Sequence, residues 1–206
     1  MDTISFREIA LIVGAYLIGA IPFGMVVSRV FNREIDLRKV GSGNIGATNV
    51  ARSLGKGAGA LTLLLDAGKA VFVLAITRLV LGASADAWFA LVGGAVFLGH
   101  VFPVYLRFKG GKGVATAMGV VAFLSPLTVS ILLVLFAVVV CCTRFVSLSS
   151  LCAAAGLPIL MALLGKPRPF LYLALLIAVV VFYTHRQNIR RLFAGQEPRF
   201  GVSKSR

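Results

Sequence analysis

The chain has 206 residues, of which 59% are hydrophobic and only 14% charged, with a mean hydropathy of +0.96. Soluble domains carry roughly a quarter charged residues, so this composition excludes an ordinary soluble fold. Apolar stretches recur from residue 9 to residue 183, and several could cross a hydrocarbon core about 30 Å thick. The sequence therefore predicts an all-α, polytopic integral membrane helical bundle, organised as a single transmembrane domain over residues 1–206.

The net charge of +14 is unevenly distributed. Most of the 21 lysines and arginines lie in segments 29–56, 107–112 and 186–206, between or after apolar runs. Because basic loops stay on the cytoplasmic side of a membrane, these segments are expected inside, with the N-terminus outside and the C-terminus cytoplasmic. The first apolar run, 9–27, is followed rather than preceded by its basic residues, which argues against a cleaved signal peptide. Basic loops without interleaved aromatic residues do not indicate nucleic-acid binding.

Apolar helices are expected in chain order at 9–31, 57–81, 86–106, 114–142, 145–164 and 169–184. A cytoplasmic tail requires an even number of crossings between residues 114 and 184. The Ser125-Pro126 pair lies near the middle of the fourth run, and proline breaks the hydrogen-bond ladder of a helix. Dividing the run there gives seven transmembrane helices. A five-crossing arrangement with one interfacial segment keeps the same loops inside.

Asp66, Lys69 and His100 are ionisable residues inside the apolar runs. Asp66 and Lys69 lie three residues apart in the second helix and are expected to neutralise one another on one face. The alternative is that Lys69 extends its side chain along the helix toward the cytoplasmic surface. His100, near the inner end of the third helix, is interpreted as a hydrogen-bonded structural histidine.

Several kinds of reactive centre are missing from the sequence. Cys141, Cys142 and Cys152 have no spacing typical of a disulfide framework or a metal site. There is no G-x-S-x-G nucleophile motif. Neither histidine has an aspartate five residues on, because positions 105 and 190 are Tyr105 and Arg190. With seven acidic residues in all, metal-dependent phosphoryl transfer has no support, and no metal or cofactor is expected.

The first polar loop, residues 41–52, reads GSGNIGATNVAR. Its glycines permit tight turns, and a glycine-rich loop that opens a helix is a natural anion site because free N–H groups point at the ligand. Thr48 or Asn49 is expected to cap the following helix, and Arg52 could clamp a phosphate through two hydrogen bonds. The candidate ligand-binding residues are Ser42, Gly43, Asn44, Thr48, Asn49 and Arg52. The alternative is a flexible connector with a helix cap.

The second polar loop, residues 108–116, reads FKGGKGVAT. Gly110, Gly111 and Gly113 would cradle a phosphate, and Lys112 would supply a positive charge. The loop lacks the G-x-x-x-x-G-K-[ST] spacing, which disfavours a nucleoside triphosphatase. Basic anchoring of the loop at the membrane surface is the alternative.

The third polar segment, residues 185–197, reads HRQNIRRLFAGQE. If it is helical, His185 and Asn188 share one face, where they could hydrogen-bond a phosphate or a polyol. An amphipathic tail lying in the interface would explain the arginines and apolar residues without any chemistry.

In order and spacing, three motifs resemble the bacterial acyl-phosphate:glycerol-3-phosphate acyltransferases. These are GSGNIGATNVAR, GHVFPVYLRFKGGKGVAT and HRQNIRRLFAGQE, and together they span nearly the whole chain. The resemblance implies a seven-helix fold in the bacterial cytoplasmic (inner) membrane, with the motifs at the cytoplasmic face. It implies acyl transfer from acyl phosphate to the 1-hydroxyl of sn-glycerol 3-phosphate, which gives lysophosphatidic acid and inorganic phosphate.

The resemblance also implies roles for individual residues. Ser42, Asn44, Thr48 and Arg52 would belong to the first substrate loop, and the second loop, Gly110–Gly113, would bind glycerol 3-phosphate. His185 and Asn188 would be active-site residues, Lys112 would hold the phosphates together, and Glu197 would be structural. The proton of the hydroxyl could pass to the acyl phosphate or to His185. An anion transporter and a non-catalytic lipid-binding scaffold are the rival functions.

Overall fold

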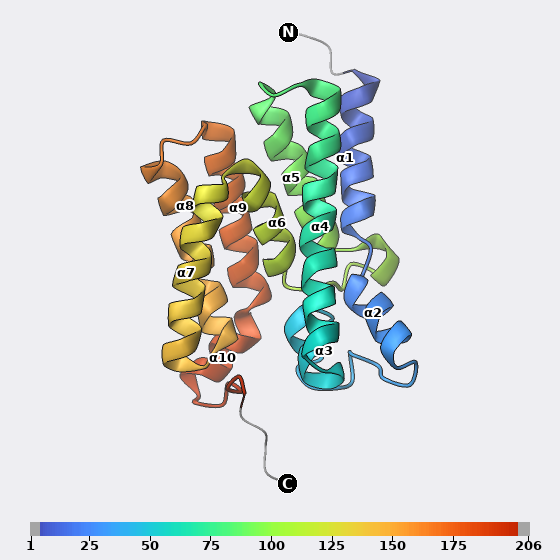
Figure 1. The fold of residues 1–206 in the computed structure, drawn as a ribbon, viewed down its shortest axis with the longest axis vertical. Helices are drawn as coiled ribbons and strands as arrows, with labels where there is room; N and C mark the ends of the chain where they lie inside the picture. Colours follow the sequence, from blue (N-terminus) through green and yellow to red (C-terminus); the bar gives the residue numbers. More distant parts are fainter. Residues whose placement is uncertain (1–4, 202–206) are drawn as a thin grey trace. The chain divides into compact units, whose positions relative to one another are not determined.

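A computed structural model describes residues 5–201 of the chain. The described residues leave out Asp2, Lys204 and Arg206, which are charged residues near the two ends of the chain. Throughout residues 5–201, the regular elements are helices. The helices form two compact units, residues 1–124 and residues 125–206, which are described separately (Figure 1).

Unit 1 contains the first two polar loops. Its helices are α1 (Phe6–Gly19), α2 (Phe23–Phe31), α3 (Ala47–Leu54), α4 (Lys56–Leu81), α5 (Asp86–Val101), the 3₁₀ turn η1 (Val104–Leu106) and α6 (Val114–Leu124). The long helix α4 packs against α1, α3, α5 and α6, so it forms the centre of the unit. In Figure 1 the short helices α2 and α3 lie near one end of α4.

Unit 2 contains the third polar segment. Its helices are α7 (Pro126–Thr143), α8 (Val146–Leu163), α9 (Arg168–Thr184) and α10 (Arg186–Phe193). Helix α8 packs between α7 and α9, and α10 follows α9 after a bend of 58°. The backbone N–H of Phe200 donates to the carbonyl of Arg144 at 2.7 Å, which fastens the chain beyond α10 to the turn between α7 and α8.

Prolines set three boundaries in this fold. The division of 114–142 at Ser125-Pro126 is confirmed, since α6 ends at Leu124 and Pro126 begins α7. The uninterrupted helix expected over 9–31 was wrong: α1 ends at Gly19 and α2 begins at Phe23, with Pro22 between them. Pro103 likewise ends the expected 86–106 helix early. Proline lacks the N–H that a helix interior needs and disfavours helical geometry at the residue before it.

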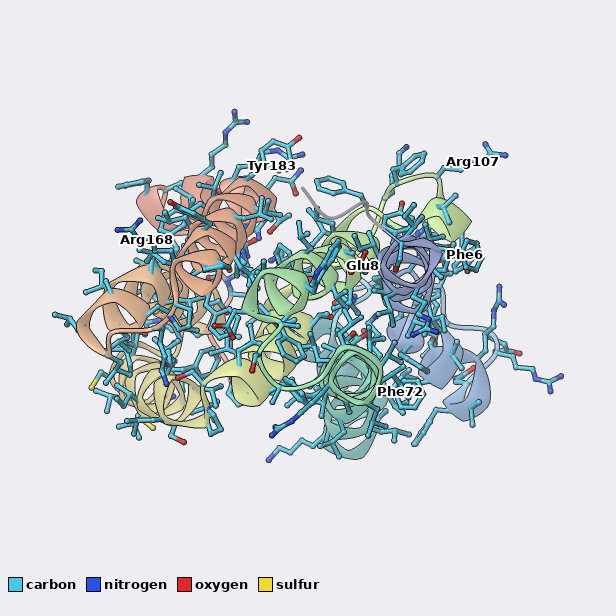
Figure 2. All side chains as sticks on the ribbon, turned by 90° about the horizontal axis from the view of Figure 1, so that it is seen from above. Phe6, Glu8, Phe72, Arg107, Arg168 and Tyr183 are labelled. Carbon is cyan, nitrogen blue, oxygen red and sulfur yellow. The ribbon has the colours of Figure 1, made fainter. Side chains whose placement is uncertain are left out.

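The lengths of the apolar helices are consistent with several membrane spans. Within the described part of the chain, five segments are long and apolar enough to cross a membrane, or six if α9 and α10 form one bent span. Helix α6 has 11 residues and a length of about 16 Å, which is short of the hydrocarbon thickness. The outward-facing apolar side chains of unit 1 include Phe6 and Phe72, which are 84% and 57% exposed (Figure 2). Seven crossings and the orientation of the termini stay predictions.

Close backbone packing fixes α5 against α1. A Cβ atom on Gly19 would collide with the carbonyl of Val96, and one on Gly99 would collide with the carbonyl of Tyr16. The Tyr16 hydroxyl also donates to the carbonyl of Phe102 at 2.6 Å. These contacts hold the C-terminal end of α5, from which the second polar loop departs.

Candidate active site

Asn49 organises the first polar loop from inside. Its side chain is buried, its Oδ1 accepts the N–H of Ser42 at 2.9 Å, and its Nδ2 donates to the carbonyls of Leu37 and Val40 at 3.0 and 3.1 Å. One amide thus satisfies three backbone groups of the segment that precedes α3. Asn49 was a candidate ligand contact, and the structure places it as the support of the loop.

The turn into α3 differs from the expected one. Asn44 Oδ1 accepts the N–H of Gly46 at 2.8 Å, and Gly46 is the residue that precedes the first turn of α3. Thr48 and Asn49 therefore lie inside the helix, and the expectation that one of them caps it was wrong. The Asn44 side chain makes the local turn that a capping side chain would otherwise provide.

The outer face of this loop carries three of the predicted side chains. Ser42, Thr48 and Arg52 are exposed, and Arg52 lies in the last turn of α3. Gly41 and Gly43 both have positive φ, at 59° and 69°, in the region that favours glycine. The loop therefore exposes two hydroxyl groups and a guanidinium group, and the buried Asn49 side chain supports its backbone.

The second polar loop is bonded to the end of α5. The N–H of Gly110 donates to the carbonyl of Val101, and the N–H of Gly111 donates to the carbonyl of His100, both at 3.2 Å. These two N–H groups are engaged by protein carbonyls, and the two hydrogen bonds shape the loop. Lys112 and the start of α6 follow directly.

Three glycines of this loop are required by packing. A Cβ on Gly110 would collide with the carbonyl of His100 and the ring of Pro103, and one on Gly111 would collide with the ring of His100. Gly113 has φ of 84°, and a Cβ there would collide with the Phe97 ring. The glycines thus let the loop lie on the end of α5.

Asp66, Lys69 and His100 form a buried cluster in the interior of unit 1. Lys69 Nζ lies 2.8 Å from Asp66 Oδ1 and 3.1 Å from His100 Nδ1. The side chains of Asp66 and Lys69 are each 2% exposed. The expected pairing is confirmed, as is the hydrogen-bonded histidine, and the alternative in which Lys69 extends toward the membrane surface was wrong.

His185 and Asn188 lie at the junction of α9 and α10, and both are buried. His185 Nδ1 is 2.9 Å from the carbonyl oxygen of Val181, which can only accept, so Nδ1 is assigned the hydrogen. Asn188 Nδ2 donates to Glu197 Oε1 at 2.6 Å. These predicted residues belong to unit 2, whereas those of the first two loops belong to unit 1.

Glu197 joins the chain beyond α10 back to that helix. Its side chain is 6% exposed and also accepts the Nε–H of Arg191 at 2.7 Å. Burial raises the pKa of this carboxyl, but hydrogen bonds from Asn188 and Arg191 and the positive charge of Arg191 lower it by more, so the pKa lies below the ordinary 4.5. Glu197 is therefore the charged partner that fixes the amide of Asn188.

Some of these side-chain contacts could not be predicted from sequence motifs. Arg191 supports Glu197, and Phe97 packs against Gly113, but neither was a candidate residue. The charges of Arg191 and Glu197 are visible in the sequence, whereas the approach of Phe97 to Gly113 depends on helix packing. Over residues 5–201, no three His, Cys, Asp or Glu side chains gather as metal ligands.

The fold defines an integral membrane protein of the polytopic helical class. The family described as glycerol-3-phosphate acyltransferase matches residues 9–195. The glycerol-3-phosphate acyltransferases of Geobacter sulfurreducens and Geotalea daltonii are 48% and 47% identical to this chain. Those alignments cover 94% and 92% of the chain and 98% and 96% of the two relatives. The chain belongs to the glycerol-3-phosphate acyltransferase family.

Two crystal structures of PlsY (YgiH), an integral membrane glycerol 3-phosphate acyltransferase, share the fold. The glycerol 3-phosphate form has a TM-score of 0.89 and 40% identity, and the lysophosphatidic acid form has a TM-score of 0.87 and 38% identity. Each match covers 95% of this chain and 96% of the PlsY chain.

Replacing Asn49 with alanine is expected to loosen the first loop. The change leaves the carbonyls of Leu37 and Val40 and the N–H of Ser42 without their partner, at a cost of about 1–3 kcal/mol. Hydrogen exchange measured by mass spectrometry should be faster over residues 37–46. The control is Asn32→Ala, which removes a similar bond to the N–H of Glu34 from an exposed turn. Equal exchange in the Asn49→Ala variant and the wild type would contradict the assigned role.

Replacing Glu197 with glutamine is expected to lower the melting temperature at neutral pH. Because the folded state lowers the pKa of Glu197, the carboxylate stabilises the fold above pH 4.5, and this stabilisation is lost as the pH falls through the lowered pKa. The difference between Glu197→Gln and wild type should therefore shrink in acid. Glu34→Gln, at an exposed position, is the control. A difference unchanged from neutral pH to pH 3 would argue against a charged Glu197 partner.

Proposed function

We propose that this protein transfers an acyl group from an acyl phosphate to the 1-hydroxyl of sn-glycerol 3-phosphate. The products are lysophosphatidic acid and inorganic phosphate, and the reaction is the first acylation step of phospholipid synthesis. Acyl phosphate and glycerol 3-phosphate are the substrates, membrane lipid is the surrounding partner, and no cofactor or metal takes part in the proposed step.

The observation that carries this proposal is the match to PlsY in two forms, named for glycerol 3-phosphate and for lysophosphatidic acid, over 95% of the chain. A phosphorylated polyol and its acylated form differ only by the acyl group. The choice of acyl phosphate as donor rests on the resemblance of the three motifs. It is also supported by the absence from the sequence of a G-x-S-x-G motif and of a histidine followed five residues later by an aspartate, the H-x-x-x-x-D pattern of other acyltransferases.

The cations of unit 1 would attract and orient the phosphates. Arg52 offers a planar guanidinium suited to two parallel hydrogen bonds with phosphate, and Lys112 offers a compact positive charge. The glycines of the second loop would contribute shape, since packing on α5 requires them. The proposed substrate-binding residues are Ser42, Gly43, Asn44, Thr48, Asn49, Arg52, Gly110, Gly111 and Gly113, with Asn44 and Asn49 acting through loop geometry.

The chemical step needs no covalent enzyme intermediate, because the acyl group arrives activated by phosphate. The 1-hydroxyl oxygen bonds to the acyl carbonyl carbon, the bond from that carbon to the phosphate oxygen breaks, and phosphate leaves. We assign the hydroxyl proton to the departing phosphate. Lys112, His185 and Asn188 are the proposed catalytic residues, and they act by positioning and by electrostatic stabilisation. Glu197 has a structural role through Asn188.

The proposed setting is the bacterial cytoplasmic membrane, with seven crossings, the N-terminus outside and the C-terminus in the cytoplasm. This arrangement follows from the basic loops and from the division at Ser125-Pro126. Helix α6 is too short to cross an undisturbed bilayer alone, so it requires shielding by protein or local thinning. The active site would then face cytoplasmic glycerol 3-phosphate.

The purified protein is expected to form lysophosphatidic acid from palmitoyl phosphate and labelled glycerol 3-phosphate. An equal reaction with palmitoyl-CoA in place of the acyl phosphate serves as the donor control and should yield no product above background. Product from the CoA ester alone would overturn the donor assignment, and product from neither donor would favour a transporter or a scaffold.

Replacing His185 with glutamine is expected to lower kcat without changing the shape of the pH–rate profile. If the substrate phosphate takes the proton, wild type and variant should show the same inflections, because no histidine ionisation controls the rate. Steady-state rates across pH 5–9 measure this. A wild-type inflection in the range where histidine titrates, absent from His185→Gln, would assign the base role to His185.

A further inference from the structure

The buried cluster of unit 1 contains a fully bonded ammonium group. Lys69 Nζ lies 2.8 Å from Asp66 Oδ1, 3.0 Å from the carbonyl oxygen of Ile21 and 3.1 Å from His100 Nδ1. The Phe23 ring centroid is 5.6 Å from the same nitrogen. An ammonium has three hydrogens, and these three neighbours can each accept one of them. Lys69 therefore joins α4 to α5 and to the break between α1 and α2.

The contacts of Nδ1 favour one tautomer of His100. Nδ1 is 3.1 Å from Lys69 Nζ, a donor, and 3.3 Å from Asp66 Oδ1, an acceptor. Because an ammonium has no lone pair and is the nearer neighbour, we assign Nδ1 as the acceptor of its hydrogen, which puts the proton of a neutral ring on Nε2. The ring is held by its Nδ1 edge, with Nε2 on the opposite edge.

The opposite edge of the ring supports the second polar loop. Nε2, Cε1 and Cδ2 of His100 are the atoms that a Cβ on Gly111 would meet first. The carbonyl of the same histidine accepts the N–H of Gly111 at 3.2 Å. His100 thus contacts Gly111 through its backbone and its ring, one residue before Lys112.

We propose that Asp66, Lys69 and His100 are positioning residues that hold the second polar loop in the shape that binds the phosphate of glycerol 3-phosphate. The inference rests on the proposed function, because it takes this loop as the glycerol 3-phosphate site. None of the three residues needs to touch substrate. Lys69 and Asp66 fix the His100 ring, and the ring fixes the backbone at Gly111 and therefore the position of Lys112.

Stability alone is a poor explanation for this cluster. Replacing a buried ion pair by apolar residues of similar volume is often neutral or stabilising, so such a pair is weak evidence for a stabilising role. Ionisable residues inside membrane segments are costly and usually serve function. This cluster contacts the loop that carries the candidate catalytic residue Lys112, and that contact provides a functional role for it.

The space shared by His100 and Gly111 allows a direct test by paired substitutions. Gly111→Ala inserts a methyl group against the ring, and His100→Asn keeps an acceptor for Lys69 while removing the ring atoms that face Gly111. Each single variant should raise KM for glycerol 3-phosphate roughly tenfold and leave KM for palmitoyl phosphate within about twofold. In the double variant the methyl group occupies the vacated space, so its KM should lie well below the product of the two single effects.

The control is Val92→Ala, a buried position on the same helix, away from the loop. It should lower the melting temperature without changing KM for glycerol 3-phosphate, which separates positioning from general loosening of α5. Additive effects of His100→Asn and Gly111→Ala, or equal increases in KM for both substrates, would overturn the inference. A wild-type protein that makes no lysophosphatidic acid would instead overturn the proposed function.

A spectroscopic measurement tests the tautomer without any activity. The sequence contains two histidines, so ¹⁵N-histidine labelling gives two sets of ring-nitrogen signals, and His185→Gln identifies the set from His100. A neutral ring protonated at Nε2 is expected. A ring protonated at Nδ1 would contradict the arrangement in which Lys69 donates to His100.

Discussion

The fit of the second polar loop against the C-terminal end of α5 is the constraint on which the account depends. At Gly110, Gly111 and Gly113 the loop comes so close to α5 and the residues that follow it that no Cβ fits. The end of α5 is itself fixed by close packing on α1 and by the hydroxyl of Tyr16. The loop is therefore shaped before any ligand arrives. A loop of this kind spends little binding energy on its own ordering, which favours affinity for a small anion.

The two loops of unit 1 share one design. In each loop, a buried side chain fixes the backbone conformation. A cationic side chain lies on the loop or on the adjacent helix. Asn49 supports the first loop and His100 the second, whereas Arg52 and Lys112 supply charge. In unit 2, Glu197 holds Asn188 in a similar way. For the proposed acyl transfer, in which the donor would already be activated, holding two anions in place would supply most of what catalysis needs.

The sequence predicted the class of fold, the break at Ser125-Pro126 and the pairing of Asp66 with Lys69, because hydropathy, proline chemistry and helical spacing are local properties. It did not predict the break at Pro22, because the residues at this break are apolar and continue the hydrophobic run. The sequence also did not show how Asn49 and the three glycines support the two loops. Their polarity and small size predicted contact with a ligand, which stays a prediction. Their contacts with the protein depend on the tertiary packing of α3 and α5, which no local pattern reveals.

The proposed reaction requires the three polar segments to face the same aqueous phase as glycerol 3-phosphate. Single cysteines at the exposed positions Ser42, Lys109 and Gln196, in a chain whose Cys141, Cys142 and Cys152 are replaced, can be labelled with a membrane-impermeant maleimide in intact cells and in inverted vesicles. Ser84, in the turn between α4 and α5, is the control for the opposite side. We expect labelling of the first three positions only in inverted vesicles and of Ser84 only in intact cells. Labelling of Ser42 and Lys109 from opposite sides would contradict the account.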